Sequence, residues 1–190
     1  MKHTDLMIDI ETLSLSTRGV MIQLGAVSFN IEDADGESDA GLSLVIPVRS
    51  QIPLGRTIDA STLSWWMDQV RENPALCSVL GAAFSSTADL QTRLEEAFGW
   101  MSDHSQMTRV WAVHPEFDIG LIKDLCMQLE IRWPWNYRAV RDVGTYNDGV
   151  RGLYTEDSRP WRERRPAHDA LEDCFAQVEW LRSIYREGLE

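Results

Sequence analysis

Two acidic residues near the N-terminus alternate with apolar residues in a pattern that indicates a metal site. Leu6–Ile10 is predicted to form a strand, and side chains two apart on a strand share a face. Asp9 and Glu11 therefore project together. Two neighbouring carboxylates repel each other and lose hydration when buried, so a buried pair needs a compensating cation. Carboxylate oxygens are preferred ligands of Mg²⁺ and Mn²⁺, and we expect such an ion here.

The alternative is a solvated edge strand that turns its polar residues outward. The strand is otherwise apolar and short, as the central strands of a sheet are, which favours the metal site.

A third acid, Asp118, lies in the first turn of a predicted helix that directly follows a predicted strand, Arg109–Val113. Acids in a first helical turn also stabilise the helix dipole, so Asp118 alone is ambiguous. If that strand neighbours the first one, its end places Asp118 near Asp9.

The last predicted helix, Ala167–Arg186, starts with a histidine and several acids. His168 opens it and Asp173 lies about a turn and a half later. Asp169 and Glu172 also belong to this acidic start, which dipole complementarity alone would explain. A histidine near carboxylates is equally the arrangement that deprotonates an attacking water. Four carboxylates and one histidine thus make two-metal hydrolysis of a phosphodiester chemically coherent.

Composition narrows the class of protein. The 190 residues suit one domain over 1–190, and 44% hydrophobic with 25% charged residues is typical of a globular protein. No apolar run is long enough to span a bilayer, the first residues show no signal-peptide pattern, and three widely spaced cysteines resemble reduced core thiols. We therefore expect a cytoplasmic protein without membrane contact.

The net charge of −12 argues against a protein that grips long duplex nucleic acid through many phosphates. A nucleic-acid substrate would be held locally, at one end.

The remaining pattern predicts an α/β fold. Val20–Asn30 and Leu42–Val48 are further strands, and their short connections favour an antiparallel meander with the first strand. Residues 137–146 are ambiguous between strand and helix, and 149–166 are predicted to form a loop. The predicted helices before the last one are Leu63–Val70 with Asp59 or Ser61 as cap, one opened by Pro74, Thr87–Met101 and Phe117–Leu129.

Three segments together resemble the exonuclease motifs of the DEDDh 3′→5′ exonuclease superfamily, which includes polymerase proofreading subunits, RNase T and oligoribonuclease. They are residues 9–12 (Asp-Ile-Glu-Thr), Phe117 with Asp118, and His168 with Asp173 five residues later. Each motif is weak singly, but their order and spacing match over residue 5 to about residue 180. Many relatives carry Asn where His114 stands. This difference concerns a contact to the substrate or to a metal ligand, and not the metal ligands themselves.

Two further segments are similar to phage exonuclease A and its mycobacterial exoribonuclease relatives. One is residues 58–66, which end in Trp65 and Trp66, and the other is the Arg-Asp-x-x-Thr of residues 141–145. The resemblance implies an RNase H-like fold: a five-stranded mixed sheet flanked by helices, with a fifth strand near residues 137–142. Related enzymes are often homodimers, although no interface is evident in the sequence.

The resemblance also implies roles for the site residues. Asp9 would bridge two divalent cations, Mg²⁺ or Mn²⁺, with Glu11 and Asp173 on the catalytic ion and Asp118 on the second. His168 would be the general base. Glu11 and His168 are thus the expected catalytic residues, and Asp169 and Glu172 are expected to stay outside the metal set.

Substrate contacts are expected from residues near these motifs. Thr12 and Leu13 directly follow Glu11 and are placed to meet the terminal nucleotide, by hydroxyl, backbone N–H or apolar wedge. Adjacent helical residues point about 100° apart, so one tryptophan of the pair belongs to the core while the other stacks on a base, unless both are core. His114 and Phe117 would shape the same pocket, although Phe117 also suits core packing.

A basic loop precedes His168, although a charge run is usually only a solvated loop. We expect it to grip phosphates upstream of the cut. Its arginines include Arg162, Arg164 and Arg165.

The sequence thus predicts a metal-dependent exonuclease that removes nucleoside 5′-monophosphates from the 3′ end of single-stranded or 3′-overhang DNA or RNA. The alternatives are a catalytically silent nucleic-acid-binding or adaptor domain and a structural cation site, which would leave His168 without a role. The choice between DNA and RNA depends on contacts to the 2′-OH, which no residue dictates.

Overall fold

The computed structural model describes residues 2–33, 36–152 and 168–189. Its centre is a mixed sheet with strand order β3-β2-β1-β4-β5. β1 pairs antiparallel with β2 and parallel with β4; β2 with β3 is antiparallel and β4 with β5 parallel. The strands are β1 His3–Thr12, β2 Met21–Phe29, β3 Ala40–Val45, β4 Ser105–Ala112 and β5 Val140–Asp142. The expected α/β fold, a five-stranded mixed sheet flanked by helices as in RNase H-like exonucleases, is confirmed.

β1 occupies the middle of the sheet, so the alternative of a solvated edge strand is excluded. It spans ten residues and is longer than the five predicted, because it pairs on both sides. Leu6, Ile8 and Ile10 face one hydrophobic core, whereas Met7 faces another. Asp9 and Glu11 alternate with these isoleucines, as the two-residue period of a strand requires.

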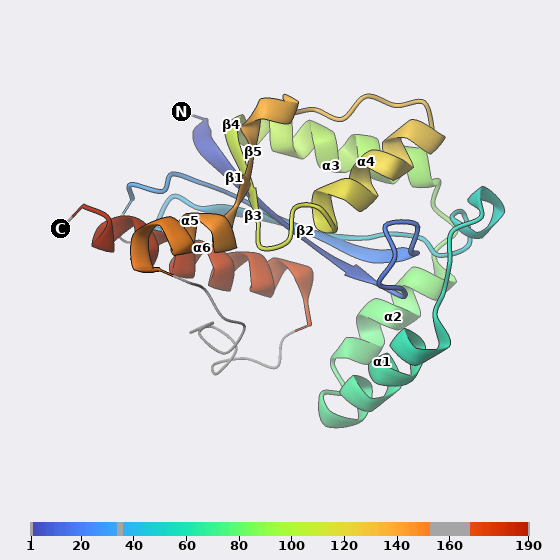
Figure 1. Cartoon of the computed structure of the whole chain (residues 1–190). Coiled ribbons are helices and arrows are strands. Elements are labelled where there is room, and N and C mark those ends of the chain that lie inside the picture. Colours follow the sequence, from blue (N-terminus) through green and yellow to red (C-terminus); the bar gives the residue numbers. More distant parts are fainter. Residues whose placement is uncertain (1, 34–35, 153–167, 190) are drawn as a thin grey trace.

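Helices cover both faces of the sheet (Figure 1). α3 and α4 pack on the face of Ile8, while α5 and α6 pack on the face of Met7. α1 and α2 enclose a third core at the start of β2, around Leu13, Ile22 and Trp66. The helices are α1 Ala60–Glu72, α2 Leu76–Ser85, α3 Leu90–His104, α4 Asp118–Gln128, α5 Val143–Arg151 and α6 Ala170–Glu187, with short 3₁₀ helices at Ile52–Leu54 and Tyr137–Ala139.

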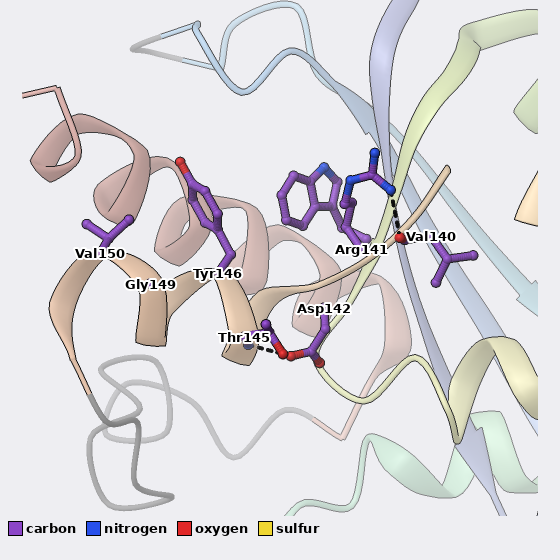
Figure 2. A pocket seen from close by; sticks show the side chains of 8 residues that line it. Val140, Arg141, Asp142, Thr145, Tyr146, Gly149 and Val150 are labelled. Atoms are coloured by element: carbon purple, nitrogen blue, oxygen red, sulfur yellow. Dashed lines mark hydrogen bonds between the residues drawn. The ribbon is translucent and has the colours of Figure 1, made fainter. Parts of the chain in front are cut away.

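Residues 137–146, which the sequence left ambiguous, divide into a 3₁₀ turn, a three-residue strand and the start of α5. The Asp142 side chain accepts a hydrogen bond from the backbone N–H of Thr145 and so caps α5. Arg141 donates to the carbonyl oxygens of Arg138 at 2.6 Å and Val140 at 2.8 Å. Figure 2 shows Val140, Arg141, Asp142 and Thr145 around a hollow of ≈ 490 Å³ between β5 and α5. This segment therefore has a structural role in starting α5.

Several predicted boundaries shift. α6 begins at Ala170, three residues later than predicted, which leaves His168 outside the helix. α5 extends to Arg151, so the first residues of the predicted 149–166 loop are helical. Among the described residues, no helix is long and apolar enough to cross a membrane. The homodimer and the cytoplasmic location stay predictions.

Candidate active site

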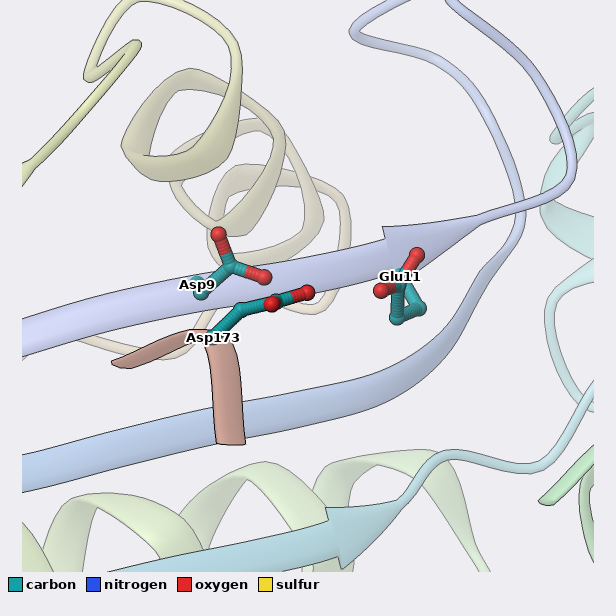
Figure 3. A group of neighbouring side chains, drawn as sticks. All are labelled: Asp9, Glu11 and Asp173. Carbon is teal, nitrogen blue, oxygen red and sulfur yellow. The ribbon is translucent and has the colours of Figure 1, made fainter. Parts of the chain in front are cut away.

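Three carboxylates converge where β1 meets the start of α6. Asp9 and Glu11 project from the same face of β1 toward Asp173, as Figure 3 shows. One oxygen from each of the three lies within 4.8 Å of the others. Asp173 lies more than 160 positions after Asp9 and Glu11 in the sequence, so only the packing of α6 on the sheet brings it to them.

Gly25 permits this close packing. It lies in β2 and pairs with Asp9 of the neighbouring strand β1. A Cβ atom at Gly25 would lie 2.2 Å from the carbonyl oxygen of Ala170, the first residue of α6. The added Cβ and the carbonyl of Ala170 are both fixed to the backbone, so the contact could be relieved only by moving a strand or the helix. The missing side chain therefore sets how near Asp173 comes to β1.

Gln23 and Asp169 fix the start of α6. The Nε2 of Gln23 donates to Asp169 Oδ2 at 2.8 Å, and its Oε1 accepts from the N–H of Ala170 at 3.1 Å. Asp169 also accepts from the N–H groups of Leu171 and Glu172, at 3.1 and 3.2 Å. Asp169 is thus the helix cap.

Asp118 comes from the opposite side of β1. It is the first residue of α4, which follows β4, and β4 pairs parallel with β1. Asp118 and Asp9 line one cavity of ≈ 320 Å³. The other lining residues are Leu15, Val113, His114, Phe117 and Gln177.

Burial and mutual repulsion make these acids hard to ionise. Burial raises the pKa of Asp9 well above its ordinary value, and the charges of Asp118, Glu11 and Asp173 raise it further. Burial and the charge of Asp173 likewise raise the pKa of Glu11. Burial raises the pKa of Asp118 to about 7, although backbone hydrogen bonds from His114 and Ile10 oppose it.

The chemistry of this donor set fits divalent cations. The three clustered residues offer hard oxygen ligands, which Mg²⁺ and Mn²⁺ prefer. A cation would also remove the repulsion that raises the carboxyl pKa values. Gln177 also lines the cavity, and its Oε1 is a buried acceptor to which no described residue donates.

His168 lies just before α6, beside the tryptophan pair. The ring centroids of His168 and Trp65 are 4.6 Å apart, edge to face, and those of His168 and Trp66 are 6.3 Å apart. Its backbone φ of +40° is uncommon for a residue with a side chain. Such strained positions cluster at functional sites, which supports a functional role for His168.

The two tryptophans divide as the helical geometry predicts. Trp66 is buried, and its Nε1 donates to the carbonyl oxygen of Thr12 at 2.9 Å. Its expected role as a substrate contact is therefore corrected to a structural one: it holds the chain that follows Glu11. Trp65 is 41% exposed and remains available to a nucleotide.

The expectation of an apolar wedge at Leu13 is also corrected. Leu13 is fully buried in the third core, and its N–H donates to the carbonyl oxygen of Val20 at 2.8 Å. The hydroxyl of Thr12 is engaged too, with the carbonyl of Ser14 at 2.7 Å. The exposed apolar residue is Leu15, which is 82% exposed and lines the cavity with Asp9. The sequence signal that could have indicated this exposed residue is a single leucine within a polar segment, beside Ser14, Ser16 and Thr17.

His114 and Phe117 lie where the sequence placed them. Both line the cavity of Asp9 and Asp118 and also a neighbouring cavity of ≈ 620 Å³, which includes Thr17 and Asp142. His114 is exposed, whereas Phe117 is half-buried and also packs on the core of α3 and α4. The two residues therefore separate the acidic cavity from a second hollow that continues along the surface.

Gln177 was not singled out from the sequence. It lies four residues after Asp173, which places both on one face of α6, and its Nε2 donates to Asp9 Oδ1 at 2.7 Å. That spacing was the available signal. The remaining expected contacts, Arg162, Arg164 and Arg165, lie outside the described residues.

Comparison with known proteins identifies a family. Residues 4–185 match the family model described as the 3'-5' exoribonuclease Rv2179c-like domain. A search of curated proteins found no match. The family match spans every acid of the site together with His168, and its description concerns an exonuclease that acts on RNA.

The close approach at Gly25 can be tested with Gly25→Ala. We expect a loss of unfolding free energy of about 1–3 kcal/mol, because the new methyl group must displace the backbone of α6. The displacement should also weaken Mn²⁺ binding, because Asp173 moves with the helix. Urea unfolding and calorimetric Mn²⁺ titration measure the two effects.

Gly81→Ala is the matched control, since a Cβ at that helical position meets nothing within 4 Å. It should be neutral or slightly stabilising. Equal effects of the two substitutions on Mn²⁺ binding would contradict the role given to Gly25.

The raised pKa of Asp118 predicts a pH dependence of stability without metal. Because its pKa rises from 3.8 to about 7 on folding, protonated Asp118 favours the folded state. This contribution is complete below pH 3.8 and is lost as the pH rises through about 7. In EDTA, Asp118→Asn should therefore be more stable than wild type at pH 8, with a smaller difference at pH 5. Urea midpoints at both values measure this; a variant less stable at pH 8 would contradict it.

Proposed function

This chain belongs to the Rv2179c-like 3'-5' exoribonuclease domain family, and on that premise we propose that it is a metal-dependent exonuclease trimming RNA from the 3′ end. One observation carries the proposal: oxygens of Asp9, Glu11 and Asp173 meet within 4.8 Å. A cluster of acids that burial makes hard to ionise is costly unless a cation compensates for it. The order and spacing of these residues also support membership of the DEDDh superfamily and the phage and mycobacterial group within it.

Four carboxylates would hold two divalent cations, Mg²⁺ or Mn²⁺. Asp9, Glu11 and Asp173 form the first set of ligands, and Asp118 joins Asp9 for the second ion. When bound, such a pair of ions stabilises the attacking and leaving oxygens of an in-line displacement at phosphorus.

His168 would accept the proton of the attacking water. The water oxygen forms the new bond to phosphorus, and the bond from phosphorus to the 3′-oxygen of the preceding nucleotide breaks. The products are a nucleoside 5′-monophosphate and a shortened chain whose 3′-oxygen takes up a proton from solvent. A neutral imidazole suits this role near neutral pH, and the ring contact with Trp65 holds it beside the start of α6.

The surroundings of the cavity support recognition of a chain end. Leu15 and Phe117 offer apolar contact beside Asp9, and Trp65 offers an exposed ring near His168. Stacking of a base on an aromatic ring is worth roughly 1–3 kcal/mol and tolerates any base. A net charge of −12 fits local binding of one end better than wrapping of a long duplex.

The rival is a catalytically silent domain that binds nucleic acid or acts as an adaptor. Such a domain has no need for the four carboxylates and the histidine together, and this chain keeps all five. A structural cation alone would not explain the positive φ of His168 just before α6.

Asp9→Asn tests the proposed chemistry. The substitution keeps the size of the side chain but removes a charge shared by both proposed ions. We expect the 3′-end shortening of a 5′-labelled single-stranded RNA to slow at least about 10³-fold in Mn²⁺. Glu172→Gln changes an exposed acid of the same helix start that is expected to stay outside the metal set, and it should reduce activity far less. Wild-type trimming by Asp9→Asn would exclude the site.

The same assay decides the substrate and the rival function. Matched RNA and DNA oligonucleotides, single-stranded and with 3′ overhangs, should show faster trimming of RNA. Equal rates on RNA and DNA would mean that the enzyme does not select for the 2′-OH. Binding of RNA without any cleavage would favour the silent domain.

Leu15→Ala tests the grip on the terminal nucleotide. Loss of an exposed apolar side chain beside Asp9 should raise KM for short RNA about 5–30-fold, the effect of roughly 1–2 kcal/mol of lost contact. Folding should be unaffected because the side chain is exposed. Met127→Ala, at another exposed apolar residue, is the control. An unchanged KM for Leu15→Ala would remove this residue from the substrate site.

A further inference from the structure

Gln177 is a buried amide that the proposed catalytic roles do not use. It lies one helical turn after Asp173 on α6 and is 2% exposed. It lines the cavity that also holds Asp9 and Asp118. A buried glutamine normally satisfies both ends of its amide, so its partners indicate its role.

One end of this amide is committed to Asp9. The Nε2 of Gln177 donates to Asp9 Oδ1 at 2.7 Å. This orientation suits a cation-bound site, in which Asp9 is ionised and only the NH₂ group of Gln177 can donate to it. Gln177 therefore orients Asp9 and occupies one of its oxygens, and the hydrogen bond favours the charged form of Asp9.

The other end has an unused acceptor. The Oε1 of Gln177 is buried, and no described residue donates a hydrogen bond to it. Other buried glutamines of the chain differ in this respect. Gln51, for example, bonds through both ends, with its Oε1 to the N–H of Met21 at 2.9 Å and its Nε2 to the carbonyl of Met21 at 2.7 Å. A purely structural role thus does not explain the unsatisfied Oε1 of Gln177.

We propose that Gln177 is a positioning residue for the divalent ion held at Asp9 and Asp118, an inference that rests on the proposed function. Its Nε2 fixes the carboxylate of Asp9, and its Oε1 accepts a hydrogen bond from a water of the hydrated ion. Mg²⁺ and Mn²⁺ are oxygen-seeking ions, and Mg²⁺ usually keeps several waters when protein carboxylates bind it. Such a water supplies the O–H donor that the buried acceptor lacks.

Residues that orient metal ligands typically change metal affinity 10–100-fold when they are replaced. We therefore expect Gln177→Met, which keeps the length of the side chain but removes both hydrogen bonds, to weaken Mn²⁺ binding 10–100-fold. Gln177→Asn keeps the amide on a shorter chain and should weaken binding less. Calorimetric titration of the full chain with Mn²⁺, without nucleic acid, measures these affinities independently of activity.

Gln128→Met is the matched control. Gln128 also uses both ends of its amide, with Arg56 at 3.0 Å and the carbonyl of Leu54 at 3.1 Å, but it lies outside the acidic cavity. Its replacement should leave Mn²⁺ affinity unchanged. Circular dichroism in EDTA establishes that each variant is folded before titration.

The outcomes separate this inference from the proposed function. If the wild-type chain binds no Mn²⁺, the proposed metal chemistry fails. If wild type binds Mn²⁺ and a folded Gln177 variant binds it within twofold as tightly, only the role of Gln177 is overturned. A variant that keeps its Mn²⁺ affinity but binds a nucleoside 5′-monophosphate more weakly would also overturn it, because the donor would then be a nucleotide hydroxyl.

Discussion

Repulsion between partly buried carboxylates is the constraint on which the rest of this structure depends. Asp9 and Glu11 share one face of the central strand, and Asp173 approaches them to within a few ångströms. Burial and like charge raise the pKa values of Asp9 and Glu11, so the folded chain holds these groups together against their own electrostatics. The surrounding packing must therefore offset the electrostatic free energy that it costs to hold these carboxylates together.

The start of α6 is where this packing is most closely specified. Gly25 leaves no Cβ between β2 and the backbone of Ala170, and Gln23 bonds both the cap residue and the first helical N–H. Both residues face the acids across the pairing of β1 with β2, since Gly25 is opposite Asp9 and Gln23 is opposite Glu11. The two strands that carry and flank Asp9 and Glu11 thus also determine where Asp173 lies.

The segment after Glu11 is likewise held in place by specific backbone contacts. The pairing of β1 with β2 shifts between Glu11 and Thr12, as at the β-bulges often found beside active sites. Trp66 holds the carbonyl of Thr12, and the buried Arg56 donates to the carbonyls of Thr17 and Gly19 at 2.9 and 3.0 Å. Between these fixed points Leu15 projects into the open beside the cavity. A rigid frame therefore presents one apolar side chain to the proposed substrate.

The sequence alone was sufficient for the fold class and for the acids. The alternation of Asp9 with Ile8 and Ile10 settles which face they share, because the side-chain period of a strand is two. The ordered motifs led to the five-stranded sheet and to the exonuclease family that the chain matches. These features are local or depend on the order of segments, and both can be read from one chain.

Tertiary structure decided which of several nearby side chains reach the site and which are buried elsewhere. Alternation would have kept Leu13 beside Glu11, but the chain leaves the sheet after Thr12 and buries Leu13, so Leu15 takes the exposed place. Trp66 rather than Trp65 entered the core, Asp169 became a cap, and Gln177 joined Asp9. Local periodicity fixes the direction of a side chain within its own element. The distance between elements depends on packing between residues that are far apart in the sequence, and no local pattern encodes that distance.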